Sequence, residues 1–87
     1  MTDTLLHDFK ATVARRLDLE PATLYGRSLR LAEVIARSPV ATNSIDLMEA
    51  VAGALAELDI DGRVELPTLT LDNTIDELVS EVEGQLR

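Results

Sequence analysis

Hydrophobic residues near the start of the chain recur at every fourth position. They are Leu5, Phe9, Val13 and Leu17, with Leu6 alongside. Side chains at this spacing share one face of an α-helix. The pattern predicts an amphipathic helix from about residue 3 to residue 18, with Asp3 as its N-cap and Glu20-Pro21 after its end.

The next stretch, residues 21–43, has a weaker pattern. Ser28 is suited to cap a short helix, which Arg37-Ser38-Pro39 would close because the residue before a proline disfavours helical geometry. The apolar positions of this minor helix are Leu29, Leu31, Val34 and Ile35.

A third helix is predicted to begin at Asn43 or Ser44. Its apolar stripe consists of Ile45, Met48, Val51, Leu55 and Leu58, at steps of three and four. Asp46 and Glu49 lie near its N-terminus, where negative charge complements the helix dipole. The turn residues 59–62 end it, and residues 64–67 are expected to be extended or irregular.

Many positions of this third helix are small. They are Ala50, Ala52, Gly53, Ala54 and Ala56. A glycine in a helix interior costs about 1 kcal/mol relative to alanine. Close packing of another helix, or room between helices for a bound apolar molecule, would explain the glycine, and we favour packing.

The last helix has the clearest start signal. Thr74 and Glu77 are three residues apart and fit a capping box. Its apolar face consists of Ile75, Leu78, Val79, Val82 and Leu86. The pattern as a whole predicts an all-α fold with three main helices, a minor one, and connections too long for a simple hairpin bundle.

Composition limits the kind of core that this chain can form. The chain has 87 residues, of which 46% are apolar, but its only aromatic residues are Phe9 and Tyr25. One small domain with a core of aliphatic side chains is therefore expected. The chain has no cysteine, no apolar run of about 20 residues and no signal-peptide pattern at its start, so we expect a cytoplasmic protein.

Charge limits the classes of partner. Sixteen acidic residues against eight basic ones give a net charge of −8. This charge disfavours nucleic acid and anionic membrane surfaces, and it favours protein partners with basic patches. Taken alone, however, the acidity is better explained by a small monomeric protein that only needs to stay in solution.

The chain offers little for catalysis. Its only histidine, His7, is predicted to lie on the surface of the first helix. The four glycines are scattered, so no phosphate-binding loop is formed. Residues 59–62 resemble the start of a calcium loop, but Thr70 stands where the closing glutamate belongs. We therefore predict a non-enzymatic protein without a metal site.

Ser44 is the residue that carries a possible chemistry. A serine that opens a helix is most often only a cap. The N-terminus of a helix is also where free backbone N–H groups and the dipole stabilise a phosphate. A serine at this place would suit a phosphodiester that stays accessible to enzymes.

Residues 44–49, Ser-Ile-Asp-Leu-Met-Glu, resemble the S-L-D-x-V-E segment of acyl carrier proteins, in which the serine bears 4'-phosphopantetheine. Residues 50–58 then correspond to the rest of that family's recognition helix. The family's landmarks D-I, E-I-P and T-T-V follow in order, at Asp59-Ile60, Glu65-Leu66-Pro67 and Asn73-Thr74-Ile75. Residues 9–17, followed by Leu19, resemble the family's first helix and its L-G-V ending, so the resemblance covers nearly the whole chain.

The resemblance implies an acyl-carrier-protein-like four-helix bundle, formed by a single domain over residues 1–87. It implies that Ser44 holds 4'-phosphopantetheine covalently, and that the thiol of this group carries an acyl or aminoacyl intermediate as a thioester. The implied partners are a phosphopantetheinyl transferase and the loading and synthase enzymes of fatty-acid, polyketide or related biosynthesis. The residues implied to dock basic patches of these partners are Asn43, Ile45, Asp46, Met48 and Glu49.

The sequence departs from this family in two places. Asn43 stands where the family usually has an aspartate. The loss of this carboxylate is expected to weaken recognition by the transferase. The segment between the first and third helices is longer than in ordinary fatty-acid carriers, and Arg27, Arg30 and Arg37 make it locally basic. These departures suggest a specialised carrier with a dedicated partner. They also leave open an unmodified helical module that acts as a protein-interaction scaffold or regulator.

Overall fold

The computed structural model describes residues 2–66 and 68–86, with only the backbone described for residues 2 and 3. This part of the chain forms five helices: α1 (Thr2–Arg16), α2 (Pro21–Tyr25), α3 (Leu31–Arg37), α4 (Ser44–Glu57) and α5 (Ile75–Leu86). The described residues form no strand, only an isolated antiparallel bridge between Arg30 and Thr74. The predicted all-α fold class is confirmed.

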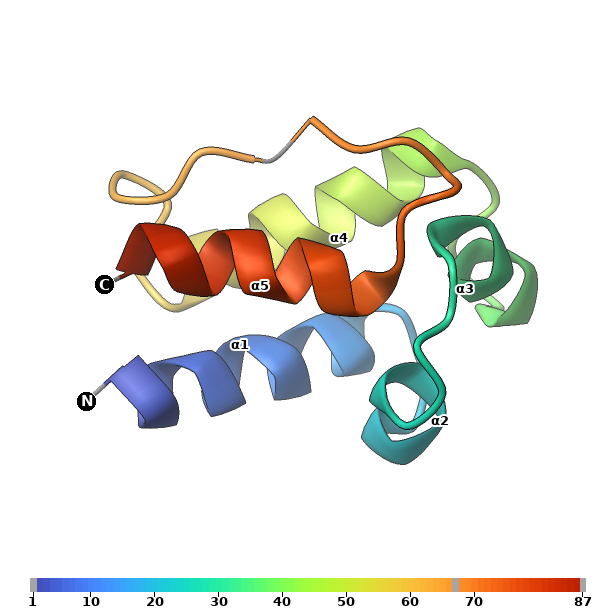
Figure 1. Cartoon of the computed structure of the whole chain (residues 1–87), viewed down its shortest axis with the longest axis horizontal. Coiled ribbons are helices and arrows are strands. Elements are labelled where there is room, and N and C mark those ends of the chain that lie inside the picture. Colours follow the sequence, from blue (N-terminus) through green and yellow to red (C-terminus); the bar gives the residue numbers. More distant parts are fainter. Residues whose placement is uncertain (1, 67, 87) are drawn as a thin grey trace.

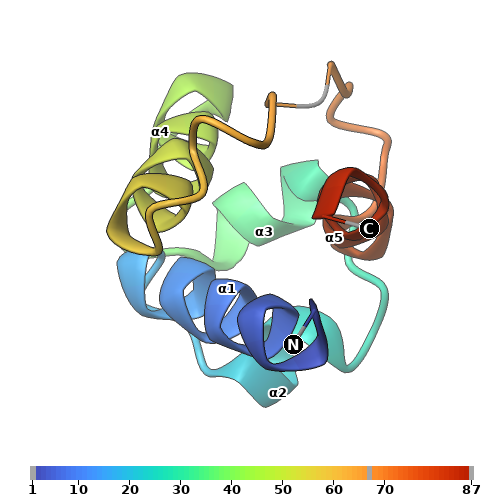
Figure 2. The same cartoon turned by 90° about the vertical axis from the view of Figure 1, so that its left-hand side faces the viewer.

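The three longer helices, α1, α4 and α5, enclose the core, and the short helices α2 and α3 lie at one end of it (Figures 1 and 2). Helix α1 packs against α4, α5 and α2, while α3 packs against α4. Helix α4 begins at the end of the molecule opposite to the start of α1 and the end of α5 (Figure 1). None of the described helices has both the length and the hydropathy to cross a membrane.

Helix α1 buries the predicted face. Phe9, Val13 and Leu17 are buried, and Leu5 and Leu6 pack against the same core. The helix ends at Arg16, slightly earlier than predicted. The prediction that Asp3 is the N-cap is wrong, because the helix already includes Thr2 and Asp3.

Helix α2 was not predicted. It begins at Pro21, whose fixed φ and missing N–H suit the first position of a helix, and it buries Leu24. Its five residues are too few to produce a periodic pattern in the sequence.

The prediction that Ser28 caps the next helix is wrong. Ser28 has a φ of 49°, and its hydroxyl donates a hydrogen bond to Oδ2 of Asp76 at 2.7 Å. Helix α3 begins at Leu31 instead, because the segment before it is held extended against the residues that precede α5. The Leu31 N–H donates to the Asn73 carbonyl, and the Ile75 N–H donates to the Leu29 carbonyl, both at 2.8 Å. This pairing fixes the long connection onto α5.

The apolar stripe predicted for α4 is only partly correct. Val51 and Leu55 are buried, but Ile45 is 66% exposed and Met48 and Leu58 are only partly buried. The buried set is Leu47, Ala50, Val51, Ala54 and Leu55. The face is rotated because α4 packs against both α1 and α3, and alanines let another helix approach closely.

Gly53 lies beneath the end of the Arg16 side chain, which is the group nearest to it. A Cβ at this position would collide with the guanidinium group of Arg16, which lies directly over the glycine. The Nε of Arg16 donates to Oε2 of Glu57 at 2.6 Å, and Arg15 donates to Oε1 at 2.6 Å. Gly53 therefore makes room for an ion-pair network that joins the ends of α1 and α4.

Helix α5 agrees with its prediction. Thr74 and Glu77 form the capping box, because the Thr74 N–H donates to Oε1 of Glu77 at 2.9 Å and the Glu77 N–H donates to the Thr74 hydroxyl at 3.1 Å. All five predicted apolar residues of α5 are buried. The side chain of Gln85 exchanges two hydrogen bonds with the backbone of Glu65, which fixes the irregular segment before residue 67 on this helix. Pro67, part of one predicted landmark, lies outside the described residues.

Replacement of Asp59 by glycine should stabilise the protein. Asp59 has a φ of 58° just after α4, where the Asp59 N–H donates to Ala56 and the Ile60 N–H donates to Leu55, the pattern of a Schellman motif. Glycine adopts this conformation without steric cost, and it removes a negative charge from the negative end of the helix dipole. We expect a gain of about 1 kcal/mol, measured by urea unfolding.

The matched control is Asp61→Gly. Asp61 is also exposed and carries the same charge, but it is not among the residues with positive φ. The glycine should then bring no conformational gain, and the added freedom of the unfolded chain should lower stability slightly. Equal effects of the two substitutions would contradict the role assigned to the backbone of Asp59.

Candidate functional site

The start of α4 is capped by Asn43, not by Ser44. The backbone of Asn43 is extended, with a φ of −158°, and its side-chain Oδ1 accepts a hydrogen bond from the Asp46 N–H at 2.9 Å. An asparagine in this role satisfies one of the N–H groups that a helix leaves free. The alternative that Ser44 serves as the N-cap is therefore wrong.

Ser44 is the first residue of the helix, and it is exposed. Its hydroxyl makes no hydrogen bond to any described residue, because Asn43 already does the capping. The backbone N–H groups of Ser44 and Ile45 likewise have no acceptor in the described part of the chain. The site thus presents a free hydroxyl beside two free N–H donors at the positive end of a helix dipole, an arrangement suited to a phosphate ester.

The carboxylate of Asp46 is hydrogen-bonded to the loop before α4. Its Oδ2 accepts hydrogen bonds from the Thr42 N–H at 3.0 Å and from the Thr42 hydroxyl at 2.8 Å. The backbone bond from Thr42, followed by its hydroxyl bond, lowers the pKa of Asp46. Thr42 donates to the Asp46 side chain, and the Asp46 N–H donates to the Asn43 side chain. These hydrogen bonds together hold residues 42–46 in one conformation.

Glu49 and Ile45 face outward. They are four residues apart on α4, so they lie on the same side of the helix, and both are exposed. The carboxylate of Glu49 makes no hydrogen bond or ion pair to the described residues. An unengaged carboxylate beside an exposed apolar side chain leaves this face available to a partner, with Met48 half-buried at its edge.

Ser38 positions the segment that leads into α4. Its hydroxyl donates to the Leu17 carbonyl at 2.7 Å and accepts from the Ala41 N–H at 3.0 Å. These bonds tie the loop before Ser44 to the end of α1. The sequence pattern predicted Ser38 only as part of a helix end, although a serine whose hydroxyl can bond N–H groups two or three residues later is a known turn signal.

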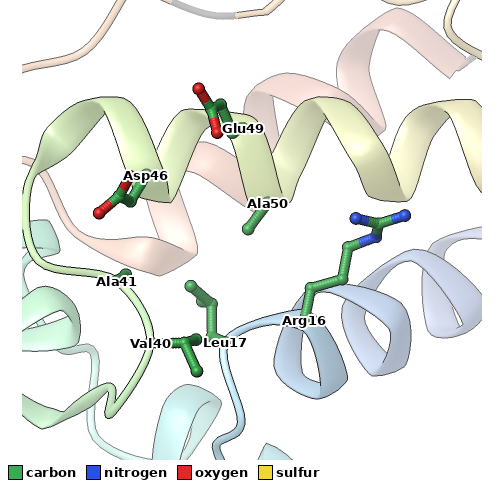
Figure 3. Close-up of a pocket in the computed structure, with 7 residues that line it drawn as sticks. All are labelled: Arg16, Leu17, Val40, Ala41, Asp46, Glu49 and Ala50. Atoms are coloured by element: carbon green, nitrogen blue, oxygen red, sulfur yellow. The ribbon is translucent and has the colours of Figure 1, made fainter.

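A surface cavity of about 340 Å³ lies between the end of α1, the loop before α4 and the first turns of α4 (Figure 3). It is lined by Arg16, Leu17, Val40, Ala41, Asp46, Glu49 and Ala50. Arg16 points toward α4, and the Asp46 carboxylate turns back toward the loop (Figure 3). The cavity therefore adds a polar recess directly beside the helix that Ser44 opens.

The structure places all six predicted site residues, 43–46, 48 and 49, on the first turns of α4 or just before them. His7 is exposed, as predicted. Within the described ranges, no three histidine, aspartate or glutamate side chains are grouped so that they could hold a metal ion. Comparison with protein-family models, curated proteins and solved structures finds no match to this chain.

Asp46→Asn tests how much the hydrogen bonds between Thr42 and Asp46 stabilise the fold at different pH values. Because the folded pKa of Asp46 is lowered, its carboxylate stabilises the fold above its unfolded pKa of about 3.9, and this stabilisation is lost as the pH falls through the folded value. Wild type should therefore be more stable than Asp46→Asn at pH 7 in urea titrations, and the difference should vanish in acid. The matched control is Asp61→Asn, which removes an exposed carboxylate that has no described partner. An equal loss of stability in both variants at pH 7 would contradict the role assigned to the Asp46–Thr42 hydrogen bonds.

Proposed function

We propose that this chain is a discrete carrier protein that bears 4'-phosphopantetheine on Ser44. The observation that carries the proposal is the division of roles at the start of α4. Asn43 caps the helix, so the exposed Ser44 hydroxyl is free for covalent modification without loss of a structural hydrogen bond. The residues present thus fit a phosphodiester at this position.

The remaining features of the site support this role. The free N–H groups of Ser44 and Ile45 offset the negative charge of a phosphodiester. The group itself would supply the thiol that this cysteine-free chain lacks, and an acyl or aminoacyl intermediate would be held there as a thioester. Catalysis belongs to partner enzymes in this proposal, and the carrier only presents its cargo to them.

Partner docking is assigned to the outward face of α4. The Glu49 carboxylate is unengaged and suits a basic patch on a partner enzyme, with Ile45 providing apolar contact. Asp46 is occupied by Thr42, so its contribution is mainly to shape the loop. Asn43 keeps the cap but offers no carboxylate to a transferase, which favours a dedicated enzyme.

The segment with α3 is consistent with a specialised pathway. Its arginines, Arg27, Arg30 and Arg37, are all exposed and would present positive charge on an otherwise acidic protein. A partner that reads both the acidic start of α4 and this basic segment would discriminate this carrier from others. Polyketide, nonribosomal peptide or modified-lipid synthesis are the proposed settings.

In vitro conversion tests the proposal. The purified chain is incubated with coenzyme A and a phosphopantetheinyl transferase of broad specificity, and its intact mass is measured. The proposal predicts an increase by one phosphopantetheine group. A panel of transferases that converts a known carrier protein but leaves this chain at its unmodified mass would favour the scaffold or regulator instead.

A further inference from the structure

A second cavity lies between α1 and α2, and none of the residues that line it belongs to α4. Its volume is about 500 Å³, within the range of about 300–1,000 Å³ that is typical of small-molecule sites. Its lining is His7, Lys10, Ala11, Pro21, Ala22, Tyr25 and Gly26. None of these residues contributes to the site proposed at Ser44.

The floor of this cavity is apolar because its residues have small side chains or expose carbon atoms to the cavity. Ala11 comes from α1, while Pro21 and Ala22 come from α2. Tyr25 is half-buried, and its hydroxyl is already satisfied by donating to the Lys10 carbonyl at 2.8 Å. Burial, followed by the nearby charge of Asp76, raises the pKa of Tyr25, so the phenol stays neutral at physiological pH.

The charged side chain that lines the cavity is a cation. Lys10 is the only lysine in the chain, and its Nζ lies 4.7 Å from the centre of the Tyr25 ring. It makes no ion pair with any described carboxylate. His7 adds an imidazole on the same side of α1, one turn earlier. A fixed cation beside an apolar floor complements a molecule with one anionic end and a hydrocarbon body.

We propose that the α1–α2 cavity binds a small amphiphilic monocarboxylate, with its apolar body on Ala11, Ala22 and the Tyr25 side chain and its carboxylate at Lys10. The volume suits a small molecule better than a folded partner's helix. The net charge of −8 opposes an anion at long range, but charges beyond about 8 Å are largely screened at physiological ionic strength. Of the nearby charges, Lys10 lines the cavity whereas Asp76 does not, so the cation is the charge that an anionic head would meet first.

Octanoate, 1-octanol and octylamine are matched probes for this proposal, because they share a hydrocarbon body and differ in the charge of the head. Binding to the full chain is followed by NMR through the backbone amides. Octanoate should shift the amides of Ala11, Ala22 and Gly26 and bind about 3–5-fold more tightly than octanol, as an exposed ion pair allows. Octylamine should bind more weakly than both.

Two variants separate the head from the floor of the site. Lys10→Gln should abolish the preference for octanoate over octanol, whereas Arg63→Gln, which removes a distant exposed cation, should not. Ala22→Leu should fill the cavity and weaken all probes, while Ala56→Leu on the exposed side of α4 should leave binding unchanged.

Three results would overturn the proposal. One is equal affinity for octanoate and octanol, and another is a set of shifts that avoids the cavity. The third is a dependence of the same amide shifts on protein concentration without a probe, which would indicate a second copy of the chain as the occupant. Each of these results is independent of whether Ser44 is modified.

Discussion

Replacement of Phe9 by alanine should lower the free energy of unfolding by about 3–5 kcal/mol. Phe9 is the only phenylalanine, its side chain is 0% exposed, and it lies in the core to which all five helices contribute. A chain of this length has a total stability of only about 4–13 kcal/mol, so the substitution should remove a large part of it. Urea unfolding followed by circular dichroism measures the effect.

Leu71→Ala is the control for Phe9→Ala. Leu71 is 43% exposed in the irregular segment before α5, so truncation there removes less buried surface and should cost less than about 1 kcal/mol. If Phe9→Ala changed stability as little as Leu71→Ala, the assignment of the core would be wrong.

Replacement of Ser44 by alanine should abolish phosphopantetheine attachment completely while the fold is retained. The hydroxyl is the only atom group that the substitution removes, and it makes no hydrogen bond to the described residues. Alanine is also a good helix former at the first helical position. Intact mass after incubation with a transferase measures modification, and urea unfolding should show a change of less than about 0.5 kcal/mol.

Ser80→Ala is the matched control for Ser44→Ala. Ser80 is an exposed serine on α5, within a helix rather than at its start. This variant should be modified at the wild-type rate. Modification that persists in Ser44→Ala would place the attachment at another residue, and a large loss of stability in that variant would contradict an unengaged hydroxyl.

The sequence predicted α1 and α5 correctly in those features that depend only on residues close together in the chain. The start of α5 was predicted because Thr74 and Glu77 cap the helix within four residues, and the face of α1 because Phe9, Val13 and Leu17 recur regularly. Long-range contacts determine what was missed. Helix α3 begins at Leu31 because Leu29 and Leu31 pair with residues more than forty positions away, which no local pattern at Ser28 reveals.

The candidate site was located from sequence, but the roles within it were not. The resemblance of residues 44–49 to acyl carrier proteins suggested a site at the start of a helix, and α4 does begin there. Whether Asn43 or Ser44 acts as the cap depends on backbone geometry, which residue types do not fix because both cap well. The apolar stripe of α4 predicted that Ile45 is buried, but Ile45 is exposed. The buried face of α4 is set by its contacts with two other helices, which the spacing of apolar residues within α4 does not reveal.

Peptide mass spectrometry of the protein purified from its native cells tests the central proposal most directly. Trypsin cleavage after Arg37 and Arg63 should release residues 38–63 as one peptide, because no lysine or arginine lies between them. The proposal predicts that this peptide carries phosphopantetheine, and that fragment ions place the group between Asn43 and Ile45. Recovery of the peptide only in unmodified form, from cells in which other carrier proteins are modified, would contradict it.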